Sequence, residues 1–264
     1  MKMWVNLEEL CNLFFELSNE ERMNILRELQ KSSANITGLS RTIDISTQEV
    51  SRHVSRLIER DVVYKDGSGS YWLTPFGDLV LSQIPGLSFA SVHRKYFKDH
   101  VLSHLPPNFL CRIGELGGSD LVDDVMVVFH NVERMIAEAE EYIWRLTDRY
   151  NMMALPYLEA ATERGVKFHL MQTKGFEYPP DWPGAGEVLG NARLKGTLKV
   201  KISDSADLFI AMSEKEVAIV SFPLVNGRFD YLGFTSKDRR VHRWCADVFQ
   251  FHWERARFQE FFTE

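Results

Sequence analysis

The hydrophobic period of the chain changes near residue 62, and this change limits what the N-terminal part can fold into. Upstream, apolar residues recur every three to four positions in four segments, which is typical of amphipathic helices. Downstream, Val62–Lys65 and Tyr71–Thr74 are strand-like runs on either side of the turn Asp66–Ser70. Pro75 then opens a further helix that we expect to reach Gln83. Helices followed by a hairpin are the order of a winged helix-turn-helix.

The first helix is expected over residues 7–17 and the third over residues 36–43. The second is expected to start at a capping box, Ser18–Glu21, and to reach about residue 30. A second capping box, Ser46-Thr47-Gln48-Glu49, predicts the start of a fourth helix. Val50, Val54, Leu57 and Ile58 give that helix one apolar face. Its opposite face carries short polar and arginine side chains that suit base edges and phosphates: Thr47, Gln48, Ser51, Arg52, Ser55 and Arg56.

We therefore predict that the fourth helix contacts double-stranded DNA. Arg52 is expected to contact a base or a phosphate, and Arg41, Arg56 and Lys65 to contact phosphates. His53 lies beside the apolar face, so we expect it to have a packing or phosphate role. Because a single small domain makes few phosphate contacts, we also predict a homodimer that binds two half-sites.

The overall charge of the chain does not favour nucleic acid. The 264 residues have a formal net charge of −6, and residues 1–90 contain 9 Lys and Arg against 12 Asp and Glu. A DNA-binding surface must therefore be a small local face on an acidic body.

The N-terminal segments resemble a known family. Three segments are similar to ArsR-type winged helices. They are the run Leu17–Leu26, the run Val50–Leu57 and the end of the hairpin, Tyr71-Trp72-Leu73-Thr74-Pro75-Phe76-Gly77. The resemblance implies that the helix carrying Ser51, Arg52 and His53 enters the major groove. The third helix lacks the family's cysteine metal motif, so metal-triggered release of DNA is not carried over to this chain.

Residues 85–112 are predicted to form a connector, with one helix over about Phe89–Leu105 between Pro85-Gly86 and Pro106-Pro107. Val92, Tyr96, Val101 and Leu105 on that helix could form a dimer contact. His93, Phe97, His100 and His104 would share one face, and the i, i+4 spacing of His100 and His104 allows either a metal site or a polar stripe. The predicted domains are thus residues 1–84, the connector 85–112 and residues 113–264.

The last of these domains alternates helix and strand, which predicts an α/β fold within an α+β protein. Helices are expected over residues 125–140, 153–164 and 237–261, with Gly165 as a helix C-cap. Strands are expected over residues 141–146, 166–171, 198–202, 207–212, 217–222 and 231–235, with a loop over 174–190.

A second resemblance covers about residues 115–260. It is a resemblance to archaeal regulators with a methanogenesis regulatory protein middle domain. The segments that carry it are Glu159–Phe168, the strand pair 207–210 and 217–220, and Arg243–Trp253. That family is similar in architecture to archaeal sugar-sensing regulators whose sensor has a phospholipase-D-like fold. The resemblance implies a cytoplasmic transcription regulator that senses a ligand.

Catalytic motifs are not found in the sequence. Phospholipase D enzymes need H-x-K-x4-D, and the one H-x-K, His93-Arg94-Lys95, lies in the connector and has His100 where the aspartate should be. The sensor half offers His130, His169, His242 and His252, none of them followed two residues later by lysine. We therefore expect no enzyme activity, no cofactor and no metal; the alternative is a phosphoester-processing enzyme or partner-docking protein with a degenerate phospholipase-D-like domain.

A ligand site is expected beyond the carboxyl ends of the first two strands of this domain, where open α/β sheets bind small molecules. The residues there are Asp148, Arg149, Tyr150, Gln172 and Lys174, which suit an anionic or polyhydroxy effector. Neither a membrane span nor a secretory signal is predicted. Cys11, Cys111 and Cys245 are too sparse for a disulfide framework and are expected to be reduced.

Overall fold

The computed structural model describes residues 6–149, 151–178, 186–204 and 207–258. The chain divides into two compact units, Met1–Ile84 and Pro85–Glu264, and the division falls within helix α5 (Pro75–Val92). Each unit is described by itself. In the described ranges, we find no helix with the length and apolar character that crossing a bilayer requires.

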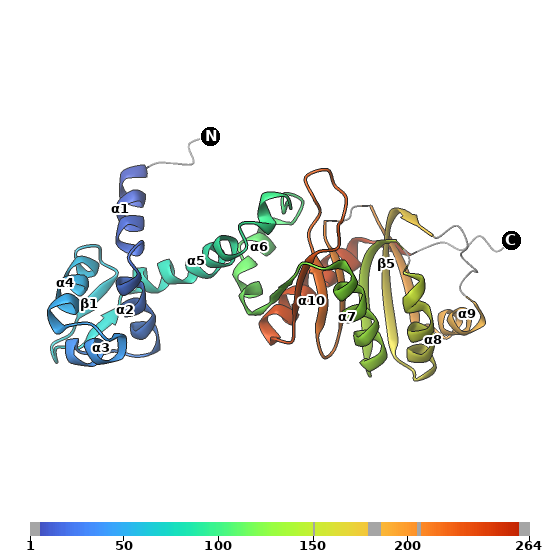
Figure 1. Ribbon diagram of the computed structural model, residues 1–264, viewed down its shortest axis with the longest axis horizontal. Helices are drawn as coiled ribbons and strands as arrows, with labels where there is room; N and C mark the ends of the chain where they lie inside the picture. The colour runs from blue at the N-terminus through green and yellow to red at the C-terminus, as the bar shows by residue number, and fades with distance from the viewer. Residues whose placement is uncertain (1–5, 150, 179–185, 205–206, 259–264) are drawn as a thin grey trace. The chain divides into compact units, whose positions relative to one another are not determined.

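The N-terminal unit has the predicted order of helices followed by a hairpin, so the winged helix-turn-helix fold is confirmed (Figure 1). The left-handed backbone of Asp44, with φ 57°, turns the chain between the third and fourth helices. We call the antiparallel hairpin the wing. The elements are α1 (Leu7–Leu17), α2 (Glu20–Lys31), α3 (Ile36–Ile43), α4 (Thr47–Ile58), β1 (Val63–Lys65) and β2 (Tyr71–Leu73).

One predicted capping box is present and the other is wrong. At α4, the Ser46 side chain accepts from the Glu49 backbone N–H and the Glu49 carboxylate accepts from that of Ser46, as predicted. At α2, the N-cap is Asn19, whose side chain accepts from the Arg22 N–H at 2.9 Å. Ser18 is the C-cap residue that follows α1; its backbone angles are helical, and its hydroxyl donates backwards to the Phe15 carbonyl.

The core of the N-terminal unit is built from the faces that the helical spacing predicts. Val50, Val54 and Leu57 of α4 are buried against Ile25 and Leu26 of α2 in one apolar cluster. Ile58, which was predicted on the same face, is instead 37% exposed because it is the last residue of the helix.

The start of α5 is tied to the wing by a short loop. The Thr74 hydroxyl accepts from the Gly77 N–H at 2.9 Å, and it donates to the Asp61 carbonyl. A Cβ on Gly77 would lie 2.2 Å from the Val62 carbonyl oxygen, so only glycine fits this close approach. The Thr-Pro-Phe-Gly sequence therefore fixes where the hairpin ends and α5 begins.

The predicted connector is wrong in its structure and its domain assignment. Instead of one helix over Phe89–Leu105, α5 ends at Val92 and is followed by turns and three short helical segments. Phe89, Tyr96, Leu105 and Phe109 are buried in the apolar core of the C-terminal unit, which therefore begins at residue 85. The short segments are η1 (Tyr96–Lys98), α6 (Pro107–Leu110) and η2 (Ile113–Gly118).

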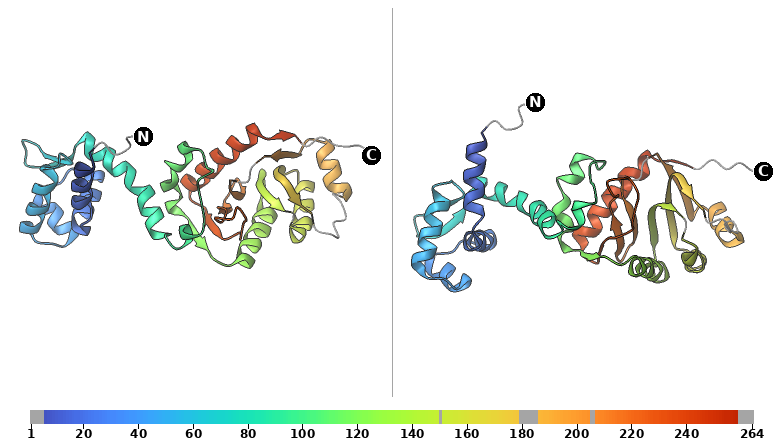
Figure 2. Two further views of the ribbon diagram at one scale, coloured as in Figure 1. Left: turned by 90° about the horizontal axis from the view of Figure 1, so that it is seen from above. Right: turned by 45° about the horizontal axis from the view of Figure 1, so that its top comes forward.

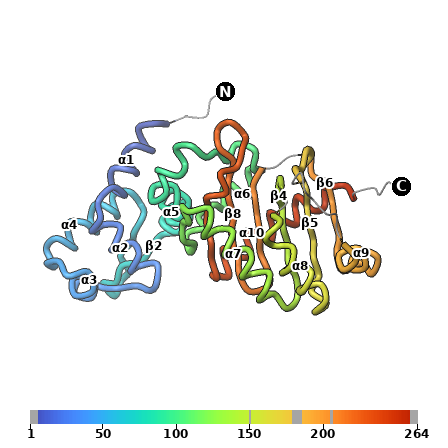
Figure 3. Tube along the Cα trace, turned by 45° about the vertical axis from the view of Figure 1, so that its right-hand side comes forward, coloured from blue at the N-terminus to red at the C-terminus, as the bar shows by residue number. Residues whose placement is uncertain are grey.

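The described strands of the C-terminal unit form one eight-stranded sheet in the order β10-β6-β5-β4-β7-β8-β9-β3 (Figure 3). β4, β5 and β6 are parallel, and each of the other pairs is antiparallel. The strands are β3 (Asp120–Val122), β4 (Tyr142–Arg149), β5 (Lys167–Glu177), β6 (Leu198–Ser203), β7 (Phe209–Ser213), β8 (Val217–Ser221), β9 (Gly233–Ser236) and β10 (Arg257–Phe258).

Helices cover both faces of this sheet. Helix α10 packs on one face with the segment that follows α5, and α7, α8 and α9 pack on the other (Figures 1 and 2). Each face has its own buried apolar cluster, so the predicted α/β layering is confirmed. The helices are α7 (Val125–Glu138), α8 (Leu155–Glu163), α9 (Gly186–Leu194) and α10 (Arg239–Arg255), with η3 (Met152–Ala154) before α8.

Several boundaries in this unit differ from the prediction. Neither β3 nor α9 was predicted. Helix α10 ends at Arg255, before the end predicted for it, and is followed by the edge strand β10. β4 and β5 extend beyond their predicted ends, to Arg149 and Glu177. Gly165 has φ 87° after α8, as expected for a helix C-cap.

Candidate functional sites

The exposed face of α4 carries most of the residues predicted to contact DNA. Thr47, Gln48, Ser51 and Arg52 are all exposed, and the opposite side of the helix is buried in the core. Arg41, at the end of α3, is also exposed. These five side chains are therefore available to a partner.

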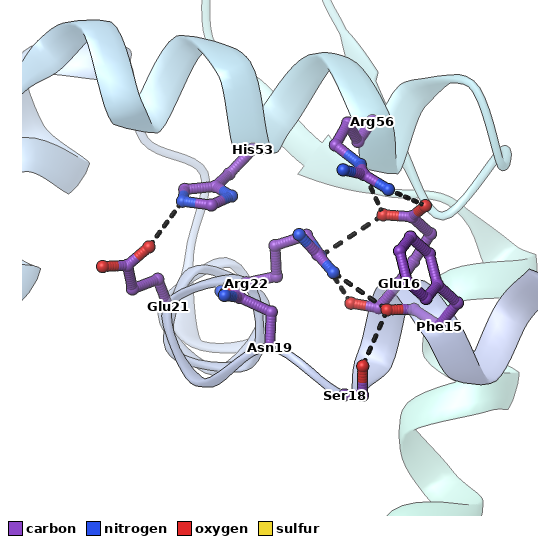
Figure 4. A network of polar contacts seen from close by, with 8 residues as sticks. All are labelled: Phe15, Glu16, Ser18, Asn19, Glu21, Arg22, His53 and Arg56. Atoms are coloured by element: carbon purple, nitrogen blue, oxygen red, sulfur yellow. Dashed lines mark hydrogen bonds and ion pairs between the residues drawn. The ribbon is translucent and has the colours of Figure 1, made fainter.

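Arg56 and His53 hold the unit together instead of facing outward (Figure 4). The Arg56 guanidinium donates to both carboxylate oxygens of Glu16 in α1, at 2.7 and 2.9 Å. His53 is 3% exposed, and its Nε2 lies 2.6 Å from the Glu21 carboxylate of α2. The pair with Glu16 gives Arg56 a structural role that was not predicted, and its phosphate role stays a prediction. Of the two roles considered for His53, the packing role is the one its burial supports.

Glu16 is the centre of a buried ionic junction between α1, α2 and α4 (Figure 4). Besides the Arg56 bonds, its backbone carbonyl accepts from Arg22 Nε at 2.5 Å, and Arg22 Nη2 donates to the Phe15 carbonyl at 2.9 Å. The hydrogen bond from Arg56, followed by the charge of Arg22, outweighs burial and holds the pKa of Glu16 below its ordinary value. The carboxylate is therefore ionised at neutral pH and joins the three helices.

The wing presents a cation and two aromatic side chains to solvent. Tyr64 and Trp72 are cross-strand partners, 45% and 41% exposed, and Lys65 is exposed beside them. The Asp66 carboxylate accepts from Ser68, Ser70 and Trp72 within the hairpin, and these bonds lower the pKa of Asp66 to about 2. The acidic group of the wing thus orders its own turn, while Lys65 stays available as predicted.

The predicted ligand residues of the C-terminal unit are only partly brought together. Arg149 and Gln172 line a cavity on the α8 and α9 side of the sheet. Asp148 accepts hydrogen bonds from the Tyr231 hydroxyl at 2.9 and 3.2 Å, and its side chain is absent from the cavity lining. Lys174 is exposed and does not line the cavity, because β5 continues past it, so this prediction is wrong. Tyr150 lies outside the described residues.

Sequence reasoning missed four polar residues of this cavity: Arg145, Thr147, Tyr178 and Arg193. Arg145 is 4% exposed at the middle of β4, on the same face as Thr147. The signal was present in the sequence, because a cation within the buried run Tyr-Ile-Trp-Arg-Leu needs a polar environment. Arg193 belongs to α9, the helix that was not predicted.

The histidines singled out in the sequence do not form a common site. His100 is buried, with Nδ1 2.8 Å from the Tyr96 carbonyl and Nε2 3.1 Å from Asp230, whereas His104 is exposed on a different segment. His93 packs against Phe89 and Phe234. The described part of the chain contains no group of three or more His, Cys, Asp or Glu side chains placed to hold a metal ion. Cys11 and Cys111 are exposed free thiols, and Cys245 is a buried one.

Comparisons with known proteins give one family match. The model described as the HVO_A0261 N-terminal domain matches residues 12–92. No curated protein matches the chain. The ArsR-type and methanogenesis-regulator resemblances stay predictions.

Solved structures with similar folds include TrmBL2, described as an archaeal chromatin protein with a novel mode of DNA binding. It is 16% identical, with a TM-score of 0.44, over 90% of this chain and 94% of that chain. Nuc from Salmonella typhimurium, a phospholipase D family member, is 12% identical, with a TM-score of 0.37, over 49% of this chain and 89% of that chain. NucT from Helicobacter pylori is 11% identical, with a TM-score of 0.37, over 53% of this chain and 97% of that chain.

Proposed function

We propose that this protein is a DNA-binding transcription regulator whose affinity for its operator is controlled by a small-molecule effector bound in the C-terminal unit. The observation that carries the proposal is the two-sided helix α4 of the winged helix-turn-helix. Its inner face is buried, and its outer face exposes Thr47, Gln48, Ser51 and Arg52, residues suited to base edges and phosphates. Exposed Arg41 and Lys65 add cations on either side of α4 in the chain.

Substitution of Arg52 tests this assignment. Once genome-wide footprinting has identified an operator, Arg52→Ala is expected to weaken specific binding by about 1–3 kcal/mol if the side chain pairs with guanine. Fluorescence anisotropy at a fixed salt concentration measures the change. Arg27→Ala is the matched control, because Arg27 is an exposed arginine on α2. Wild-type operator affinity in Arg52→Ala, or an equal loss in Arg27→Ala, would refute the role of α4.

The second part of the proposal is a homodimer, which would double the phosphate contacts of one small basic face. The dimer surface predicted on the connector is not supported, because Tyr96 and Leu105 are buried within the C-terminal unit. Helix α1 is a better candidate, because Leu7 and Phe14 are 58% and 47% exposed on it. Light scattering at micromolar concentration should give twice the mass of the chain; a monomer that also stays monomeric on DNA would contradict the proposal.

We propose further that the C-terminal unit binds its ligand without chemistry. Of the histidines there, His169 stacks on Trp253 with ring centroids 4.6 Å apart, and His242 Nε2 lies 2.8 Å from the Ser213 carbonyl. Neither histidine lines the cavity on the α8 and α9 side of the sheet that Arg145, Arg149 and Arg193 line. Binding alone suffices for regulation, since a ligand that prefers one arrangement of the protein shifts the population able to bind DNA.

A further inference from the structure

Two cavities of the C-terminal unit adjoin along β4. The smaller, of about 60 Å³, lies between β4–β6 and the helices α8 and α9. The larger, of about 310 Å³, is bounded by residues from α7, η3, β4 and β7. Both are lined by Arg145, Thr147 and Arg149, which alternate along one face of the strand. A molecule in either cavity therefore meets the same polar wall.

The charge of this wall is positive. Arg193 joins Arg145 and Arg149 around the smaller cavity, and no aspartate or glutamate of the described residues lines either cavity. Arg149 forms ion pairs with the carboxylates of Asp148 and Glu177, at 3.9 and 3.7 Å, and neither carboxylate lines either cavity. Guanidinium groups pair with carboxylate and phosphoryl oxygens in a planar, two-bond geometry. Burial lowers the pKa of Arg193, whose guanidinium lines the smaller cavity.

A buried hydrogen-bond donor lines the larger cavity. Asn151 uses its side-chain oxygen to accept from the Met153 N–H at 3.0 Å, which leaves its amide nitrogen as the free end. That nitrogen is buried, and within the described structure it has no hydrogen-bond partner. Buried donors are nearly always satisfied, so this one needs an acceptor. An oxygen of a bound ligand is the simplest acceptor at this position.

The remaining walls are apolar and partly aromatic. Phe129, Phe209 and Tyr231 line the larger cavity, with ring centroids of Tyr231 at 5.8 Å from Phe129 and 5.2 Å from Phe209. Leu158, Leu170 and Leu189 line the smaller one. Aromatic walls favour a flat apolar group through offset or edge contacts. The larger cavity has the volume for a single ring, whereas the smaller has room for little more than an oxyanion.

We infer that these adjoining cavities bind a small organic anion, with its phosphoryl or carboxylate group among Arg145, Arg149 and Arg193 and its ring against Phe129, Phe209 and Tyr231. This inference deepens the proposed function, because it gives the chemical class of the effector. It replaces the broader expectation of an anionic or polyhydroxy molecule.

The experiment uses the full-length chain and phenyl phosphate, with benzoate, inorganic phosphate and phenol as comparison probes. The dissociation constant, by titration calorimetry, and the melting temperature of the protein are measured with each probe. Phenyl phosphate or benzoate is expected to bind and to raise the melting temperature, with a stabilisation that grows as the logarithm of one plus its concentration over its dissociation constant. Inorganic phosphate should bind more weakly, and phenol should not bind. Equal binding of phenol, or no binding of either aromatic anion, overturns the inference.

Substitutions locate the binding site. Arg149→Gln and Asn151→Ala are each expected to raise the dissociation constant of the aromatic anion by about tenfold, the loss of one charge-assisted bond. Arg243→Gln is the matched control, because that arginine is exposed on α10 and lines neither cavity. Arg145 is buried, so removal of its charge could prevent folding. At that position the conservative substitution Arg145→Lys is used. Unchanged binding in both Arg149→Gln and Asn151→Ala would place the anion elsewhere and overturn the inference.

Operator binding measured with and without the anion separates this inference from the proposed function. If the anion binds at the arginines and operator affinity does not change, the ligand class stands and effector control by that ligand fails. If Arg52→Ala leaves DNA binding intact while Arg149→Gln weakens anion binding as expected, the DNA assignment fails alone.

Discussion

Glu16→Ala is expected to destabilise the N-terminal unit by about 3 kcal/mol, because it removes one partner from a buried ionic junction. Arg22 would stay buried without the carboxylate that lies 3.3 Å from its guanidinium, and α1 would lose its bidentate link to Arg56 on α4. Calorimetry of the full chain should show the loss in the transition that includes the N-terminal unit, because Glu16 and its partners lie within Met1–Ile84. Glu59→Gln, at the exposed residue that follows the last residue of α4, is the control.

The pH dependence of this loss identifies its electrostatic origin. Because the pKa of Glu16 is lowered in the folded state, its ionisation contributes stability above the ordinary glutamate pKa of about 4.3. That contribution disappears as the pH falls through the lowered folded pKa. The difference in unfolding free energy between wild type and Glu16→Ala should therefore shrink in acid. A difference that stays constant from pH 7 to strongly acidic conditions would mean that Glu16 acts only through packing.

The parts of the fold that the sequence predicted are those determined by neighbouring residues. The Ser46–Glu49 capping box, the helix Ile36–Ile43 and the wing all depend on contacts within a few positions. Hydrophobic spacing also predicted which face of α4 is buried. Local periodicity and capping chemistry were sufficient for these elements.

The connector was wrong because its structure is set by contacts far along the chain. The Tyr96 hydroxyl donates to the Leu232 carbonyl at 3.1 Å and accepts from the Phe222 N–H at 3.0 Å. His100 reaches Asp230 in the same way. Helical spacing over Phe89–Leu105 gave no sign of these partners, and tertiary packing overrode it.

The same limit explains why the structural partners of two predicted DNA-binding residues were not foreseen. His53 and Arg56 have the residue types and helix positions of DNA contacts, but their partners Glu21 and Glu16 lie 32 and 40 residues away. Arg52, one position from His53, is exposed as predicted. Conversely, Arg145 belongs to the candidate ligand site although its strand looks like ordinary core. Residue type and period give the face of an element, whereas the partner on that face requires the fold.

Trp244→Ala is expected to destabilise the C-terminal unit by about 3–5 kcal/mol, the cost of removing a large aromatic side chain from a core. Trp244 is fully buried on α10. Its Nε1 donates to the Phe109 carbonyl at 3.2 Å, and its ring lies 6.3 Å from that of Phe109 and 6.4 Å from that of Phe222. Because Phe109 belongs to the segment after residue 85, the substitution also loosens that segment from α10.

Limited proteolysis and calorimetry together test this expectation. Proteolytic cleavage within residues 93–118 should become faster in Trp244→Ala. In calorimetry, the melting temperature of the C-terminal unit should decrease. Trp72→Ala is the control, because Trp72 is 41% exposed on the wing and outside this core. If Trp244→Ala shifted the transition of the N-terminal unit instead, or cost less than about 1 kcal/mol, residues 85–118 could not be an integral layer of the C-terminal core. The predicted separate connector would then describe the chain better than the division at residue 85.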